Sequence, residues 1–323
     1  MMTSSRRTGD AGRRRGWPVA AATVLFAVAA MATSPVASAS ASAPVALANG
    51  PVVTMEEVVS GDDYNNPKEV TAYCHGGKKL IGVGFYASTD SAGGVIVDQA
   101  IPAVNRGVGL DDKVAVTAYE TAAGVTSPWR LTARAICASG LSNVEVVSRP
   151  SAIDTVSPKT ITADCPLGKR VVGSSFQGLN SPGEVIVTKV NPIAGGGAGG
   201  KDTVSVTAYP DDDGIAGNWG VTAFAFCATT PSGWEIKSNS LNQTGDSLFV
   251  GMDCGPGNVG LGSGWLFEDV SGVAAGNVLL YNMSVVLFPQ FNNIYIAMST
   301  GREDPDGTPA TWKLTTKVVC ATA

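Results

Sequence analysis

The cysteines are the residues of this chain whose spacing is most informative. The chain of 323 residues has six of them, and they fall into two recurring frames. Cys74, Cys165 and Cys254 open a C-x-x-G frame, while Cys137, Cys227 and Cys320 close a frame that begins with tryptophan. Several connectivities are open to six cysteines, but equivalent positions in repeated modules should form equivalent bonds. We therefore predict the disulfides Cys74–Cys137, Cys165–Cys227 and Cys254–Cys320. A zinc site is the alternative, and it is disfavoured because C-x-x-C spacing and clustered histidines are absent.

Carboxylates are the other side chains that could do chemistry. Asp and Gly are concentrated in two loops, at 211–214 and 303–307. Clustered carboxylate oxygens suit Ca²⁺, and the candidate ligands are Asp211, Asp213, Asp304 and Asp306. We favour a solvated hairpin turn instead, because Asp-Gly tolerates positive φ and neither loop completes a calcium-binding loop. A glycosidase would need two carboxyl groups about 5–9 Å apart, and nothing in the sequence aims these loops at each other.

Nucleophilic catalysis finds little support in the sequence. The single histidine, His75, follows an opening cysteine where the other copies have Pro166 and Gly255. No G-x-S-x-G elbow occurs, and the Gly-rich run at 195–200 lacks the Lys-Ser/Thr of a phosphate loop. We therefore interpret His75 as an exposed turn residue. We expect no catalytic residue and no cofactor other than the calcium alternative.

Three copies of one module must position these residues. The copies span 51–139, 140–229 and 230–323, roughly 90 residues each. Each copy reads as about six short strands with period-two alternation; Val70, Ala72 and Cys74, for example, share a face. The predicted fold is all-β, with three disulfide-stapled, β-sandwich-like repeats. A pseudo-threefold β-prism is the alternative, and the short links between copies leave open whether they close on one another or stack as a rod.

The aromatic residues divide into recurring and non-recurring ones. Two recurring sets are assigned to the core: Trp129, Trp219 and Trp312, and Phe85, Phe176 and Trp265. Sugar stacking is the alternative role for the first set. The third copy is the richest in aromatics, which could stack on sugar rings or anchor a protein partner. Its candidate binding residues are Trp234, Trp265, Tyr281 and Phe291, and a differently packed core is the favoured alternative.

The N-terminal region reads as an export signal. Five arginines precede an apolar run from Val19 to Ala32, and the small residues at 37–41 offer A-x-A cleavage sites. Residues 1–41 are therefore interpreted as a signal peptide and 42–50 as a short leader segment, with a secreted, extracellular product. Arg6-Arg7 hints at twin-arginine export, but the general secretory route fits better. No later stretch is apolar for long enough to predict a membrane span.

The charge balance limits the class of partner. The leader holds five of the 22 Lys and Arg and one of the 27 Asp and Glu, which leaves 17 basic and 26 acidic side chains and a formal charge of −9. Nucleic acid and anionic membranes attract clustered Lys and Arg, so neither is expected as a partner.

Two resemblances follow from these motifs. The frame from Cys165 to Gly173, with its closing tryptophan-to-cysteine strand, resembles a repeat of secreted, mostly uncharacterised actinobacterial proteins. More distantly, Asp111-Asp112-Lys113-Val114 and Asp202-Thr203-Val204 in cysteine-bounded copies are similar to vitelline membrane outer layer protein I. That family has a three-sheet β-prism and is linked to glycan-rich extracellular coats. Its repeats are much shorter, and its Trp-Gly openings are absent here.

The favoured function is non-enzymatic binding. We expect a secreted protein that recognises a glycan or another cell-surface polymer through its repeat loops. A structural or adaptor component of an extracellular multi-protein assembly, with other secreted proteins as partners, is the first alternative. A carbohydrate-active enzyme that uses the loop carboxylates is the second.

Overall fold

The computed structural model describes residues 50–88, 94–104, 110–211, 214–243, 247–269, 278–291, 293–303 and 311–323. The described residues form one compact unit that contains all three repeats. The described residues are almost entirely in strands, with helix limited to a 3₁₀ turn at Pro289–Phe291. The all-β prediction is confirmed.

Each repeat contributes six strands. The first repeat has β1 (Val52–Val59), β2 (Lys68–Cys74), β3 (Lys79–Ser88), β4 (Val95–Ala103), β5 (Asp112–Glu120) and β6 (Arg130–Ser139). The second has β7 (Glu145–Pro150), β8 (Lys159–Asp164), β9 (Lys169–Leu179), β10 (Val185–Ile193), β11 (Thr203–Pro210) and β12 (Gly220–Thr229). The third has β13 (Glu235–Gln243), β14 (Ser247–Asp253), β15 (Asn258–Asp269), β16 (Val278–Phe288), β17 (Ile294–Glu303) and β18 (Trp312–Thr322).

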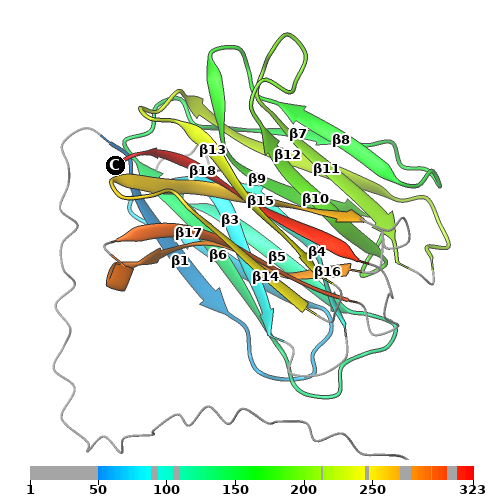
Figure 1. The fold of residues 1–323 in the computed structure, drawn as a ribbon. Helices are drawn as coiled ribbons and strands as arrows, with labels where there is room; N and C mark the ends of the chain where they lie inside the picture. Colours follow the sequence, from blue (N-terminus) through cyan, green and yellow to red (C-terminus); the bar gives the residue numbers. More distant parts are fainter. Residues whose placement is uncertain are drawn as a thin grey trace, which may run out of the picture. The chain divides into compact units, whose positions relative to one another are not determined.

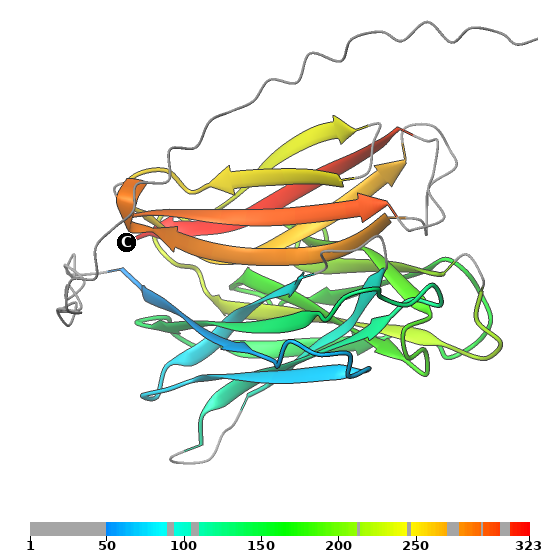
Figure 2. The ribbon, with the colours of Figure 1, turned by 90° about the horizontal axis from the view of Figure 1, so that it is seen from below.

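Every sheet is shared between two repeats. The three six-stranded sheets have the orders β1-β6-β3-β16-β17-β14, β2-β5-β4-β9-β12-β7 and β13-β18-β15-β10-β11-β8. Each repeat thus gives its first, sixth and third strands to one sheet and its second, fifth and fourth to another. The fold is sandwich-like, as predicted, but no sheet belongs to a single repeat. Because the third repeat shares sheets with both the first and the second, the copies close on one another, in agreement with the pseudo-threefold alternative. Figure 2 shows the yellow-to-red strands of the third repeat stacked against those of the first two.

The seams between repeats have very little backbone pairing. The pairs are Gln99 with Gln177; Lys189 and Val190 with Leu266 and Trp265; and Asn282 and Met283 with Tyr86 and Phe85. Side chains at the centre must therefore hold the seams together. Phe85, Phe176 and Trp265, which occupy the same position in the three repeats, meet edge to face with ring centroids 5.5–6.1 Å apart. All three are at most 1% exposed, and their strands β3, β9 and β15 lie together in Figure 1.

Three equivalent glycines bring the backbones of these strands into contact. Gly82, Gly173 and Gly262 each lie three residues before an aromatic of the central triad. A Cβ on Gly173 would lie 3.0 Å from the Cα of Gly82, and one on Gly262 would lie 2.6 Å from the Cα of Gly173. No side chain fits there, since Cβ atoms do not approach backbone so closely. The glycine that recurs eight residues after each opening cysteine is therefore a packing requirement of the closed ring.

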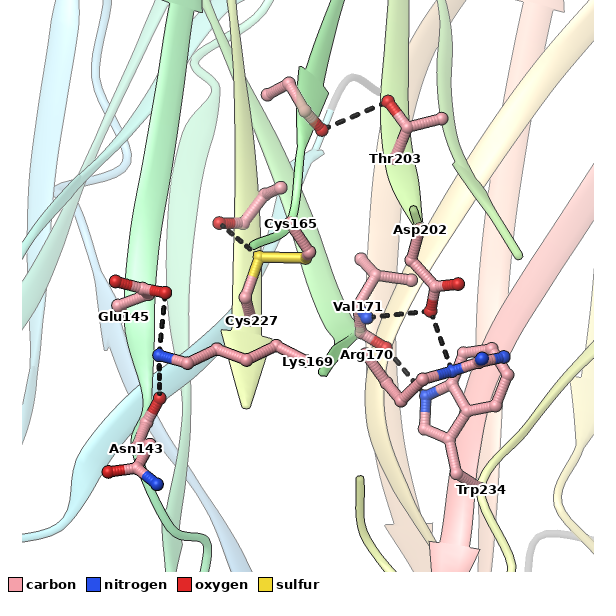
Figure 3. The surroundings of a disulfide bond; sticks show 12 residues. Asn143, Glu145, Cys165, Lys169, Arg170, Val171, Asp202, Thr203, Cys227 and Trp234 are labelled. Carbon is pink, nitrogen blue, oxygen red and sulfur yellow. Dashed lines mark hydrogen bonds and ion pairs between the residues drawn. A yellow bond between two sulfur atoms is a disulfide. The ribbon is translucent and has the colours of Figure 1, made fainter. Parts of the chain in front are cut away.

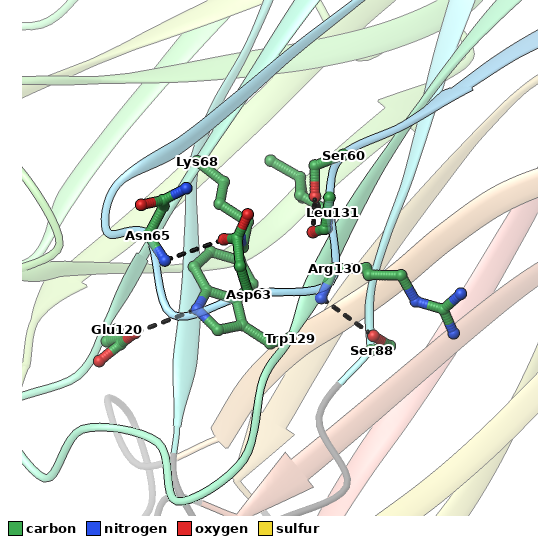
Figure 4. A network of polar contacts seen from close by, with 10 residues as sticks. Ser60, Asp63, Asn65, Lys68, Ser88, Glu120, Trp129, Arg130 and Leu131 are labelled. Atoms are coloured by element: carbon green, nitrogen blue, oxygen red, sulfur yellow. Dashed lines mark hydrogen bonds and ion pairs between the residues drawn. The ribbon is translucent and has the colours of Figure 1, made fainter.

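The recurring tryptophans are buried, with exposures of 0–1%. The Nε1–H of Trp129 donates to Glu120 Oε1 at 3.0 Å (Figure 4). The Lys68 ammonium lies 4.9 Å from the centroid of the Trp129 ring and forms an ion pair with Asp63. Trp312 donates in the same way to Glu303. The core assignment is confirmed, and sugar stacking by these tryptophans is excluded by burial.

The predicted disulfides are confirmed: Cys74–Cys137, Cys165–Cys227 and Cys254–Cys320, with sequence separations of 63, 62 and 66. Each bond joins the two sheets to which its repeat contributes, because the opening cysteine ends or follows a second strand and the closing one lies on a sixth. Closing loops of this size stabilises the fold by about 4 kcal/mol each in the chain-entropy account.

We predict that Gly173→Ala destabilises the whole fold. The added methyl would overlap the Ile81 carbonyl oxygen, and overpacking a core costs about 1–3 kcal/mol; we expect the upper end because the obstruction is backbone. Urea denaturation measures the change. Gly217→Ala is the matched control: nothing lies within 4 Å of its Cβ position, so a shift within about 0.5 kcal/mol is expected. Equal stability of the two variants would contradict the glycine contact.

Candidate functional site

The acidic loops are described only in part. Asp213, Asp304 and Asp306 lie outside the described residues. Asp211 is 6% exposed, its backbone carbonyl accepts from the Gly214 N–H at 2.9 Å, and Gly214 has φ 79°. The Gly214 hydrogen bond and positive φ are typical of the turn that we favoured, but the Asp211 side chain is buried and not solvated as expected. In the described part of the chain, His, Cys, Asp and Glu side chains do not gather in a group of three or more that could hold a metal ion.

Two of the third repeat's aromatic candidates pack against other residues. Trp265 is 1% exposed within the central triad, which confirms its assignment to the core and excludes it as a surface binding residue. Trp234 is half-buried; its Nε1–H donates to the Val171 carbonyl at 2.8 Å, and the Arg170 guanidinium lies 3.7 Å from its ring centroid. Figure 3 shows Arg170 between Trp234 and the buried carboxylate of Asp202, 3.0 Å away. The ring face that Arg170 covers is closed to a sugar, and the contact fastens the third repeat to the second.

Tyr281 and Phe291 are the other two aromatic candidates of the third repeat. Tyr281 is half-buried, and burial raises the pKa of its hydroxyl. The Phe291 backbone ends the 3₁₀ turn, but its side chain lies outside the described residues. Because Trp265 is buried, the four predicted residues do not form one surface.

An exposed group of side chains that our sequence reasoning did not combine surrounds Tyr73 on the first repeat. We define the Tyr73 cluster as Tyr73, His75, Asp111 and Lys113. Tyr73 is 39% exposed and lies directly opposite Lys113 in the β2–β5 ladder. The Lys113 ammonium is 5.8 Å from the tyrosine ring centroid. The His75 ring is nearly parallel to that of Tyr73, at an angle of 16° and 6.1 Å between centroids.

The His75 imidazole is oriented by a carboxylate. Its Nδ1 lies 2.8 Å from Asp111 Oδ2, and its side chain is 67% exposed. An acidic acceptor at Nδ1 favours the tautomer with the proton on that nitrogen, which directs Nε2 away from Asp111. His75 is thus an exposed turn residue, as predicted, and it is held in a defined orientation.

Local strand geometry explains why the cluster faces solvent. Ala72 and Cys74 are fully buried, so period-two alternation turns Tyr73 outward between them. The disulfide to Cys137 fixes the end of β2. Beside Asp111, the buried carboxylate of Asp112 accepts from the Leu80 N–H at 3.1 Å. The exposed groups therefore stand on backbone that is anchored on both strands.

The Tyr73 cluster is not repeated. At the position of Tyr73, the other copies have Asp164 and Asp253, and at that of Lys113 they have Thr203 and Ile296. The signal available in the sequence was this asymmetry, together with the single histidine. It was missed because Tyr73 lies in a strand that we analysed only for its buried face.

A buried carboxyl group lies at the seam between the first and second repeats. Asp98 occupies a bulge of β4 between Val97 and Gln99 and is 5% exposed. Burial raises its pKa to about 7, although the Gly183 backbone N–H bonds to it. Its Oδ1 has no hydrogen-bond partner within the described residues and lies 2.5 Å from where a Cβ on Gly178 would be. The bare Cα of Gly178 is what leaves room for this carboxyl.

Comparison with known proteins assigns no family, because neither a protein-family model nor a curated protein sequence matches the chain. The three disulfides indicate an oxidising compartment. Within the described residues, no helix is both long and apolar enough to cross a membrane.

We predict that Asp98→Asn stabilises the protein at alkaline pH. The folded protein retains the Asp98 proton up to about pH 7, whereas an unfolded chain releases it near pH 4. The contribution of Asp98 to the free energy of unfolding therefore falls as the pH rises from about 4 to 7. Asparagine has the same shape without the charge, so the gain in unfolding free energy at pH 8 should reach about 4 kcal/mol, with little change at pH 4.

Urea denaturation at the two pH values measures this effect. Asp62→Asn is the control, since Asp62 is exposed and its replacement should leave both values unchanged. If the wild-type protein and the Asp98→Asn variant were equally stable at pH 8, the buried carboxyl group would not be held neutral in the folded protein.

Proposed function

We propose that this protein is a secreted binding module that recognises a glycan or another cell-surface polymer, with the Tyr73 cluster as its contact site. The observation that supports this most is the exposed Tyr73 ring, flanked by Lys113 and His75 and supported by anchored strands. An aromatic face packs against the C–H groups of a sugar ring, while ammonium, imidazole and carboxylate groups bond its hydroxyls. The three disulfides and the export-like N-terminal sequence support secretion.

The size of the cluster sets the expected affinity. One aromatic contact contributes about 0.5–1.5 kcal/mol and each hydrogen bond about 1 kcal/mol. A single sugar would then bind with a dissociation constant of about 1 mM. A polymer with many identical units would be retained more tightly through repeated engagement by several protein molecules. A polymer is therefore a better partner for this surface than a free monosaccharide.

A second function, as an adaptor in an extracellular assembly, is supported by the outer face of the third repeat. Phe249 on edge strand β14 is 53% exposed, and the partly exposed Ile296 and Met298 lie on the same face of β17. The first repeat has Lys113 and Ala115 where the third has Ile296 and Met298. Apolar side chains concentrated on one sheet face are typical of protein contacts.

We predict that Tyr73→Ala weakens retention on a polymer selected from a glycan array at least tenfold, because losing the ring contact and a bond made by its hydroxyl costs about 1.5–2.5 kcal/mol. Binding isotherms on the immobilised polymer measure the change. Phe249→Ala is the matched control, since it removes an exposed aromatic on the equivalent strand of the third repeat. Loss of binding in Phe249→Ala but not in Tyr73→Ala would move the contact to the third repeat. Absence of any retained polymer would contradict the proposal.

A further inference from the structure

Two lysines lie together on the outer face of the sheet shared by the second and third repeats. Lys317 is on β18 and Lys189 on β10, with β15 between them. On β15 the residue paired with Lys317 is Gly264. A Cβ on this glycine would lie 2.3 Å from the Pro192 side chain and 2.4 Å from the Val190 carbonyl oxygen, so β10 packs directly against it. The Lys317 ammonium bonds the Pro192 carbonyl oxygen at 3.3 Å. Its side chain therefore reaches over the glycine toward β10, the strand that carries Lys189.

Neither lysine has a carboxylate partner within the described residues. Glu268, which lies on the same face of β15 as Gly264, is paired with Lys313. Burial, and then the positive charge of Lys189, lower the pKa of the Lys317 ammonium. Two like charges in a partly buried position repel each other, and an anion between them would remove that cost.

In the first repeat, the cation at the position equivalent to Lys317 has a counter-ion. Its residue equivalent to Lys317 is Arg134, which forms an ion pair with Glu57 at 2.7 Å. Glu57 is paired with Arg134 in the β1–β6 ladder, and Ser238 takes that place opposite Lys317 in the β13–β18 ladder. The cation is thus retained in the third repeat while its counter-ion is replaced by a serine hydroxyl.

We infer that Lys189 and Lys317 form a binding site for an oxyanion: a sulfate, phosphate or carboxylate group that contacts both ammonium groups. The site is distinct from the Tyr73 cluster, which lies on a different sheet, and it does not depend on the proposed function. The chain is acidic, so this local pair of cations is not part of a general positive surface.

The first probe is sodium sulfate, compared with sodium chloride of matched ionic strength. Both are used at millimolar concentration, because the general stabilisation of proteins by excluded salts is small there. We expect the thermal midpoint of the full-length protein to rise with sulfate but not with chloride. Lys317→Gln and Lys189→Gln should each raise the apparent dissociation constant for sulfate at least tenfold. Lys79→Gln, which removes an exposed lysine of the first repeat, should leave it unchanged.

Ser238→Glu keeps the experiment decisive even if a lysine variant fails to fold. It supplies the carboxylate that Arg134 already has, so it should remove the sulfate response while leaving the midpoint in chloride at or above the wild-type value. Binding to dextran sulfate, compared with binding to uncharged dextran, then shows whether the site takes a sulfate ester on a polymer as well as the free ion. An absent sulfate response in the wild type, or an equal response in all four variants, would overturn the site.

Discussion

Three backbones meet at Gly82, Gly173 and Gly262, and this contact constrains the rest of the structure. A Cβ on Gly173 or Gly262 would overlap the neighbouring backbone, and one on Gly82 would be in tight contact with it. Three residues further along each strand, Phe85, Phe176 and Trp265 fill the centre with edge-to-face contacts. Because the seams have only one or two paired residues each, these central contacts, rather than backbone hydrogen bonds, hold the repeats together. The disulfides then tie each repeat across the two sheets that it helps to build.

Repetition separates scaffold from site in this molecule. Features present in every copy, such as the glycines, the central aromatics, the cysteines and the buried tryptophans, all serve the closed ring. The chemically distinctive groups occur once. The Tyr73 cluster belongs to the first repeat, the Asp98 carboxyl to the seam between the first and second, and the Lys189–Lys317 pair to the seam between the second and third. A pseudo-symmetric scaffold thus provides equivalent positions that have diverged in charge and polarity.

The sequence predicted the local structure and the crosslinks well, because both depend on patterns within one repeat. Period-two alternation identifies which residues of a strand are buried, and recurrence of Cys74 and Cys137 identifies a bond. Alternation within a strand does not identify the neighbouring strand in the sheet. The sharing of sheets between repeats could therefore not be predicted from it. Trp265 was assigned both to the core, because its position matches Phe85, and to a binding surface, because its repeat is rich in aromatics; its burial confirms the core assignment. Tyr73 was overlooked because an outward residue in a regular strand looks the same whether it contacts water or a ligand.

Cooperativity of unfolding tests the closed ring most directly. If each sheet needs strands from two repeats, no repeat can unfold while its neighbours stay intact. Differential scanning calorimetry of the oxidised protein should then show one transition whose calorimetric enthalpy equals its van't Hoff enthalpy. Separate transitions, or a calorimetric enthalpy about three times the van't Hoff value, would mean that the repeats are independent modules and would contradict the shared-sheet account.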